Sequence, residues 1–180
     1  MRTLIAGYRP YELGIFKSSQ KEVTVLKSLF RHKALEYIES GTEWFIIQGY
    51  SGIELYAGEM ILELKNEGYE VGLAVLMPFY EFNSKYKEED AEMLQKIISG
   101  CDFHDYIFKK PYENPAMFKQ INRFLVTNTD QGLIVYDDAA DSKVRFLYEQ
   151  ILEFSGNHPY NIERIEFDEI NTFAELSYDS

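Results

Sequence analysis

Short apolar runs alternate along the chain with longer segments whose apolar residues recur at helical spacing. The short runs predict strands over residues 3–7, 44–49, 70–79, 106–108, 132–136 and 161–167. The longer segments predict helices over residues 22–39, 52–67, 91–99, 115–125 and 142–154. The charged, aromatic stretch 80–90 has no strand character, and residues 176–180 are expected to fray.

This alternation predicts an α/β fold, a Rossmann-like three-layer α/β/α sandwich with a mostly parallel sheet. The chain has 180 residues, of which 46% are apolar, and no linker or repeat divides it. A single domain over residues 1–180 is therefore expected. Sheets of this kind bind ligands beyond the carboxyl ends of their strands, so the residues that follow strands are the candidate site residues.

Charge and composition exclude several classes of function. The chain has 18 Lys and Arg against 30 Asp and Glu, a net charge of −12. Such a surface repels phosphate backbones, so nucleic acid is not expected as a partner. The longest uncharged stretches, 44–53 and 71–80, are shorter than the roughly 20 residues of a membrane helix, and Glu12 interrupts any signal peptide. A cytoplasmic protein without membrane insertion is expected. Cys101 and His104 form only half of a ligand pattern, so no metal site is predicted.

Ser51, Asp137 and His158 follow one another in the Ser, Asp, His order of α/β-hydrolases. A nucleophile elbow needs glycines two residues before and two residues after the serine. Here Gly52 follows Ser51 directly and Ile53 occupies the second glycine position. A serine-hydrolase triad is therefore not expected, and His158 is interpreted as a loop histidine.

Residues 46–54 predict a strand, a glycine turn and a helix start, an arrangement that presents N–H groups and a positive helix end to an anion. The turn is neither a GxGxxG nor a Walker A motif. It is either a phosphate cradle supplied by Gly49, Ser51 and Gly52 or a turn that only packs helix against strand. Three roles are open for Glu54: it complements the helix dipole, binds a ribose or polarises a water. The dipole predicts that its carboxylate is ionised at neutral pH. On the cradle hypothesis, Gly52→Ala abolishes ligand binding and leaves the fold intact.

Aromatic residues are abundant, with 14 Tyr, 13 Phe and 1 Trp. Several of them lie at predicted strand ends or in the loops that follow: Tyr8, Tyr11, Tyr50, Phe79, Tyr80 and Tyr86. These rings either sandwich a base or pack on one another beneath the loops.

Residues 7–16, 49–54, 78–79 and 111–122 resemble the YpsA-like proteins of low-GC Gram-positive bacteria, and the resemblance covers nearly the whole chain. The opening GYRPYELGIF is a specific signature. This family belongs to the SLOG group of Rossmann-like domains, named for the DNA-processing protein DprA (SMF) and the LOG phosphoribohydrolases. The resemblance implies a compact Rossmann-like domain, a nucleotide or NAD-derived ligand similar to ADP-ribose, and an association with bacterial cell division.

Within the group, residues 47–54 are similar to the SGLARGID turn of DprA-like proteins, with Glu54 in place of aspartate. The PGGxGTxxE segment of the LOG enzymes corresponds to residues 135–140, which contain no glycine. Phosphoribohydrolase activity is therefore not expected. The resemblance also places Arg123 where it can reach a phosphate.

Together these observations predict a nucleotide-binding sensor or adaptor, with ADP-ribose, NAD or a related nucleotide as ligand and cell-division proteins as partners. Oligomerisation of the chain is left open. Two alternatives remain: a slow hydrolase of an N-glycosidic or pyrophosphate bond with Glu54 as general base, and a protein-interaction domain. The candidate binding residues are Gly7, Tyr8, Gly49, Ser51, Gly52, Glu54, Pro78, Phe79, Arg123 and Asp137.

Overall fold

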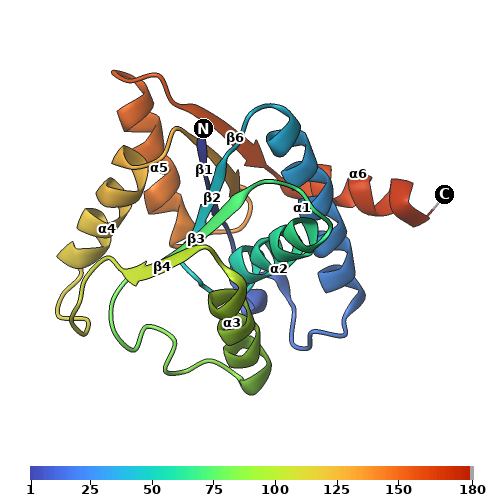
Figure 1. Ribbon diagram of the computed structural model, residues 1–180, viewed down its shortest axis with the longest axis horizontal. Coiled ribbons are helices and arrows are strands. Elements are labelled where there is room, and N and C mark those ends of the chain that lie inside the picture. The colour runs from blue at the N-terminus through green and yellow to red at the C-terminus, as the bar shows by residue number, and fades with distance from the viewer. Residues whose placement is uncertain (179–180) are drawn as a thin grey trace.

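A six-stranded, all-parallel sheet forms the centre of the computed structural model, which describes residues 1–178 (Figure 1). The strand order is β4-β3-β2-β1-β5-β6. The strands are β1 (Arg2–Ala6), β2 (Trp44–Ile47), β3 (Gly72–Met77), β4 (Phe103–Tyr106), β5 (Gln131–Val135) and β6 (Asn161–Ile165). The predicted α/β class and parallel sheet are confirmed, because every neighbouring pair of strands is parallel.

Helices cover both faces of the sheet (Figure 1). One layer contains α1 (Lys21–Glu39), α2 (Ile53–Asn66), α3 (Glu88–Gly100) and α6 (Phe167–Tyr178), in which α2 packs against α1 and α3, and α6 packs against α1. The other layer contains α4 (Ala116–Thr127) and α5 (Val144–Ser155). A short 3-10 helix, η1 (Pro10–Leu13), follows β1. Within residues 1–178, no helix is both long enough and apolar enough to cross a membrane.

The inner strands owe their apolar runs to this double cover. Strands β1, β2, β3 and β5 are buried almost throughout, with Leu4, Phe45, Leu73 and Leu133 completely inaccessible to solvent. Burial of such side chains removes apolar surface from water at roughly 25 cal/mol per Å². The edge strands β4 and β6 are only partly covered.

Two sequence predictions need correction. The fourth strand begins at Phe103, three residues before the predicted start at Tyr106, and ends at Tyr106, two residues before the predicted end at Phe108. As an edge strand with exposed side chains it carries no apolar run, whereas Ile107 and Phe108 pack on the core from the following loop. Residues 176–178, expected to fray, belong to α6, which was not predicted. Residues 179–180 lie outside the described part of the chain.

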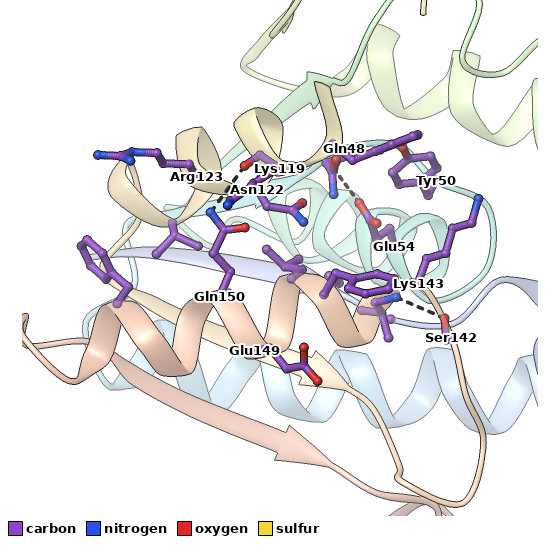
Figure 2. A pocket seen from close by; sticks show the side chains of 18 of the residues that line it. Gln48, Tyr50, Glu54, Lys119, Asn122, Arg123, Ser142, Lys143, Glu149 and Gln150 are labelled. Atoms are coloured by element: carbon purple, nitrogen blue, oxygen red, sulfur yellow. Dashed lines mark hydrogen bonds between the residues drawn. The ribbon is translucent and has the colours of Figure 1, made fainter. Parts of the chain in front are cut away.

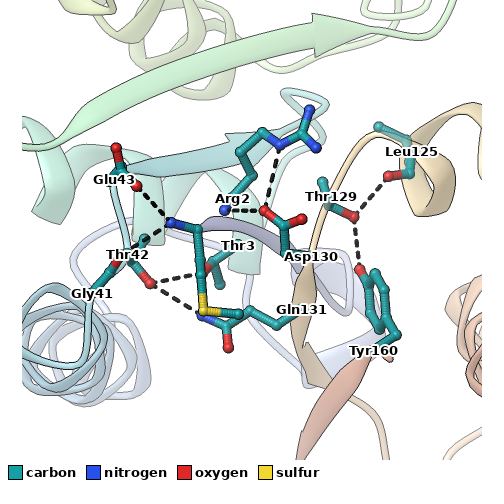
Figure 3. A network of polar contacts seen from close by, with 11 residues as sticks. Arg2, Thr3, Gly41, Thr42, Glu43, Leu125, Thr129, Asp130, Gln131 and Tyr160 are labelled. Carbon is teal, nitrogen blue, oxygen red and sulfur yellow. Dashed lines mark hydrogen bonds and ion pairs between the residues drawn. The ribbon is translucent and has the colours of Figure 1, made fainter. Parts of the chain in front are cut away.

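A polar network joins the amino ends of β1, β2 and β5 (Figure 3). The hydroxyls of Thr3 and Thr42 lie 2.8 Å apart, and Gln131 Nε2 donates to Thr3 Oγ1 at 2.8 Å. The Arg2 N–H donates to an Asp130 carboxylate oxygen at 2.7 Å. These bonds satisfy polar groups at the amino edge of the sheet, and the large cavity lies at the opposite, carboxyl edge.

Candidate functional site

A cavity of about 1090 Å³ opens beyond the carboxyl ends of β1 and β2 and continues between α4 and α5 (Figure 2). Its inner part, here the strand-end pocket, is lined by Gly7, Arg9, Tyr11, Gln48, Tyr50, Glu54, Tyr112, Phe118, Ser142 and Lys143. Its continuation, here the helix groove, is lined mainly by Asn122, Arg123, Gln150, Phe154 and His158. Gln150 Nε2 donates to the Lys119 carbonyl at 3.4 Å, which links the two helical walls.

Tyr8 follows β1 and packs against the segment that follows β5, where the strand order reverses. Its side chain is completely buried, and its ring lies 5.4 Å from Phe167 and 6.4 Å from Tyr136 between centroids. The phenol accepts the Asp137 N–H at 2.8 Å and donates to the Ala140 carbonyl at 2.7 Å. Open α/β sheets commonly bind ligands at this reversal point. In this protein the cavity lies beside the reversal point, on the side of β2 and α4.

The backbone polar groups of the glycine turn after β2 are hydrogen-bonded to side chains of α2 and of the loop before α3. The Gln48 N–H donates to Glu54 Oε1 at 2.6 Å, and the Ser51 N–H donates to the Tyr86 hydroxyl at 3.1 Å. That hydroxyl in turn donates to the Gly49 carbonyl at 3.0 Å. The turn is thus held by α2 and by the loop before α3, and its Gln48 and Ser51 N–H donors are already engaged.

Glycine is required in this turn for steric reasons. The Ile53 N–H donates to the Tyr8 carbonyl at 3.1 Å, which brings two chain segments into close contact. A Cβ on Gly52 would lie 2.3 Å from that carbonyl oxygen, at a residue with φ of +90°. A Cβ on Gly7 would lie 2.7 Å from the Ile53 side chain. Gly52→Ala must therefore strain the turn and displace its contact with Tyr8, contrary to the expectation that this substitution affects ligand binding alone.

Glu54 is buried at the wall of the strand-end pocket, with 2% of its surface exposed. Burial raises its pKa from 4.5 to about 7, although the nearby Arg9 charge and backbone N–H groups of the turn favour the ionised form. The expectation of a fully ionised carboxylate at neutral pH is corrected, because desolvation outweighs the helix dipole. Near pH 7 this carboxyl can either accept or donate a proton.

Arg9 and Tyr50 form a stacked pair in the strand-end pocket. The guanidinium carbon lies 3.6 Å from the centroid of the Tyr50 ring, a cation–π contact. Within residues 1–178 the Arg9 side chain makes no ion pair. Burial raises the pKa of Tyr50 to about 12, so the ring stays neutral. Arg9 therefore lines the cavity without an ion-pair partner, and its charge acts on the neighbouring Glu54 carboxyl.

Three helices begin at the strand-end pocket. Residues at or near the starts of α2, α4 and α5 line the cavity, namely Glu54, Pro115 and Val144. Each helix start carries a partial positive charge from its aligned peptide dipoles. Lys119 and Lys143 line the same cavity. Glu12, Glu149 and Glu153 also line the cavity, so positive and negative side chains both occur along its wall and the helix starts add their partial positive charge at the strand-end pocket.

The YpsA family model, described as the YspA SLOG family, matches residues 3–170. The chain belongs to the YpsA SLOG family. UPF0398 proteins of Listeria monocytogenes and Enterococcus faecalis are 37% and 35% identical to it, over 91% and 92% of this chain and 90% and 92% of theirs. The UPF0398 protein of Staphylococcus haemolyticus is 34% identical over 96% of this chain and 93% of its own. Membership of a SLOG family favours nucleotide-related binding.

The fold of this YpsA-family protein is similar to that of DNA processing protein A from Helicobacter pylori. The TM-score is 0.57 at 14% identity, and the match covers 99% of this chain and 80% of the other. That protein binds single-stranded DNA. The exclusion of nucleic acid from the partners is therefore wrong, because a net charge is a sum over the whole surface and binding depends on the local field. Residues 109–127 carry four basic residues against one acidic residue, namely Lys109, Lys110, Lys119 and Arg123 against Glu113.

The cavity of this YpsA-family protein brings together some of the predicted site residues. Gly7 and Glu54 line the strand-end pocket, and Arg123 lines the helix groove with an exposed side chain. Figure 2 shows Arg123 far along α4 from the end where Glu54 lies. Gly49, Ser51 and Gly52 form the turn beside the pocket and are not part of its lining.

Besides the turn glycines and Ser51, four further predicted residues lie outside the cavity lining: Tyr8, Pro78, Phe79 and Asp137. Tyr8 is buried beneath the carboxyl edge, and the carbonyl of Pro78 accepts the Phe108 N–H at 3.1 Å. Phe79 lies behind the wall, with its centroid 5.4 Å from that of Tyr112. The Asp137 carboxylate accepts the Phe167 N–H at 3.0 Å, at the start of α6. These side chains support the site instead of facing it.

Other cavity residues were not among the predicted site residues. Arg9 was marked only by its place in the GYRPYELGIF segment, directly after Gly7 and Tyr8. Lys119 and Asn122 lie in the segment 111–122 that carries the family resemblance, which assigned them no role, and Lys143 carries no local signal, because only the approach of α4 to α5 brings it to this cavity. His158 stacks on Phe154 at 4.1 Å between centroids, in the helix groove. Within residues 1–178, no group of three or more His, Cys, Asp or Glu residues could hold a metal ion.

Proposed function

We propose that the strand-end pocket binds a nucleotide, with ADP-ribose or another NAD-derived nucleotide as the preferred class, and that the protein acts as a sensor or adaptor. The observation that carries this proposal is that three helix starts and the Arg9 side chain open onto the same cavity. Helix N-termini and arginine are the two elements that proteins most often direct at phosphate. The SLOG family membership supports the same class of ligand.

The pocket also contains the apolar surface that a base and a ribose require. Tyr50, Tyr112 and Phe118 line it, and the two latter rings pack at 5.4 Å between centroids. Asn122 and Gln48 add polar groups suited to hydroxyls and base edges. A purely inorganic anion would make no contact that requires these aromatic rings. A ligand with both phosphate and ring fits the lining better.

Isothermal titration calorimetry with ADP-ribose, NAD and AMP tests the proposal. Wild-type protein should bind at least one of them, and Arg9→Met should weaken binding about tenfold or more, as expected for loss of a charged contact. Lys85→Met is the matched control, because it removes one positive charge from an exposed side chain outside the cavity lining. A wild type that binds none of these nucleotides contradicts the proposal and favours the protein-interaction domain. A short oligo(dT) should be titrated alongside. If only the oligonucleotide binds tightly, the ligand of the pocket is single-stranded DNA and not a free nucleotide.

Glu54 supports a second candidate, a slow nucleotide hydrolase. It is buried in the pocket wall with a pKa of about 7, which suits a general base near neutral pH. In this reaction Glu54 takes a proton from water, and the oxygen attacks the N-glycosidic carbon or the phosphorus as the leaving group departs. Glu54→Gln should then retain binding and reduce product formation about a hundredfold or more. Chromatography of ADP-ribose, NAD and AMP after incubation measures this, and equal turnover in the variant eliminates Glu54 as the base.

The association with cell division rests on family resemblance alone and stays part of the proposal. A sensor of this kind would change its partner affinity when the pocket is filled. Pull-down of division proteins from a Gram-positive lysate, with and without the bound nucleotide, tests this role. Equal recovery in both conditions would contradict ligand-dependent adaptor function.

A further inference from the structure

Tyr11 is the most exposed large apolar side chain in the part of the chain that the structure describes, with 73% of its surface accessible. It lines the cavity. Within residues 1–178 its ring stacks on no other ring, and its hydroxyl has no hydrogen bond. The fold therefore makes no use of this ring.

The backbone around Tyr11 is held firmly. The Arg9 N–H donates to Glu12 Oε1 at 2.7 Å, and the Ile15 N–H donates to the Pro10 carbonyl at 2.9 Å. Ile15 itself is buried, which anchors the end of the turn in the core. The exposed ring thus projects from a fixed turn and not from a loose loop, so little ordering entropy would be lost on binding.

An aromatic ring on a fixed support at a cavity mouth is suited to stacking on a flat ligand ring. Every nucleobase has such a face, and stacking is insensitive to the base edge. Tyr11 is two residues from Arg9, whose guanidinium faces the same cavity. One turn of chain therefore carries a cation for a phosphate and a ring for a base.

We propose that Tyr11 stacks on the base of the nucleotide whose phosphate contacts Arg9, so that the segment after β1 recognises one mononucleotide unit. This inference rests on the proposed function. It adds the residue that separates base-containing phosphates from sugar phosphates. Phe16, on the same segment, provides the comparison, because it is 67% exposed but is not part of the cavity lining.

Titration of AMP and of ribose 5-phosphate into wild type, Tyr11→Ala, Tyr11→Phe and Phe16→Ala tests the proposal. Tyr11→Ala should bind AMP about tenfold more weakly or worse. Binding of ribose 5-phosphate should be unchanged in that variant, because it has no base. Tyr11→Phe and Phe16→Ala should bind AMP like wild type. Circular dichroism should show equal folding, since both substituted rings are exposed.

The outcomes separate this inference from the proposed function. AMP binding that is equal in wild type and Tyr11→Ala overturns the stacking role and leaves nucleotide binding intact. Equal weakening of AMP and ribose 5-phosphate in Tyr11→Ala also overturns it, because the contact would then be to sugar or phosphate. Failure of AMP to bind wild type, while ADP-ribose binds, overturns recognition of a mononucleotide unit. Failure of every nucleotide overturns both proposals.

Discussion

At the scale of single residues, Glu54 has the most demanding environment in the site. Its carboxyl group is buried, yet it accepts the Gln48 N–H at 2.6 Å and so orders the glycine turn. The helix dipole favours the charged form, and burial favours the neutral form. Burial dominates, because the loss of hydration acts on the whole charge whereas the dipole contributes only part of one.

The free energy of unfolding should depend on pH through the protonation of Glu54. The folded-state pKa of about 7 exceeds the ordinary value of 4.5, so the folded protein binds more protons between these pH values. The contribution of Glu54 to stability should therefore be present below about pH 4.5 and be lost as pH rises through 7, on the order of 3 kcal/mol in total. Urea unfolding of wild type and Glu54→Gln at pH 5 and pH 8 measures it. The variant should gain relative to wild type at pH 8, with exposed Glu22→Gln as the control substitution; a pH-independent difference would contradict this.

At the scale of elements, α6 is held by tertiary contacts that no local pattern announces. Lys33 of α1 lies 2.6 Å from Glu163 of β6 and 2.8 Å from Glu169 of α6. The Tyr37 hydroxyl also donates to Glu163 at 2.8 Å. Only 12% of the Lys33 side chain is exposed, so its charge is poorly solvated and depends on the two partly exposed carboxylates.

Removing Lys33 should therefore loosen α6 selectively. Lys33→Met should lower the unfolding free energy by about 1–3 kcal/mol, because it leaves two carboxylates without their shared cation. Amide hydrogen exchange should accelerate in α6. Arg31→Met is the matched control on the same helix, since its ion pair with Glu67 is more exposed and is therefore expected to contribute little to stability. Equal effects of the two substitutions on α6 exchange would refute a special role for Lys33.

At the scale of the whole molecule, two electrostatic fields oppose each other. The net charge of −12 repels an approaching anion from a distance. Arg9, Lys119, Lys143 and the three helix starts attract it at short range within the strand-end pocket, although Glu149 and Glu153 line the adjoining part of the cavity. Anion binding depends on both the long-range and the short-range field. The net charge describes only the first, so it was a poor guide to the class of partner.

Salt should separate these two fields in the kinetics of AMP binding. Raising the ionic strength from about 0.01 M to about 0.15 M shortens the Debye length from about 30 Å to about 8 Å. Association should become faster as the long-range repulsion is screened, and dissociation should also become faster as the short-range contacts weaken. Stopped-flow measurements at several KCl concentrations provide both rates. Slower association at higher salt would mean that the basic segment 109–127 dominates even at long range.

Much of the fold follows from local patterns. Apolar runs identified the four inner strands, since residues covered on both faces leave an unbroken signature. The edge strand at Phe103 and the helix α6 gave no comparable signal, because half-exposed elements contain ordinary polar residues. The candidate site followed the same division. Gly7 and Glu54 were found from their positions after strands, whereas Lys119 and Lys143 became neighbours only through helix packing.

The sequence by itself determined the parallel α/β class, the loops that carry chemistry and the likeness to the YpsA family. These are properties of the hydrophobic period and of short motifs, which can be recognised in the linear sequence. Tertiary structure alone decided that Tyr8 is buried against the segment after β5, that Glu54 is buried, and that α2, α4 and α5 begin around one pocket. Burial and the convergence of helix dipoles depend on how distant segments pack, so no local pattern can encode them.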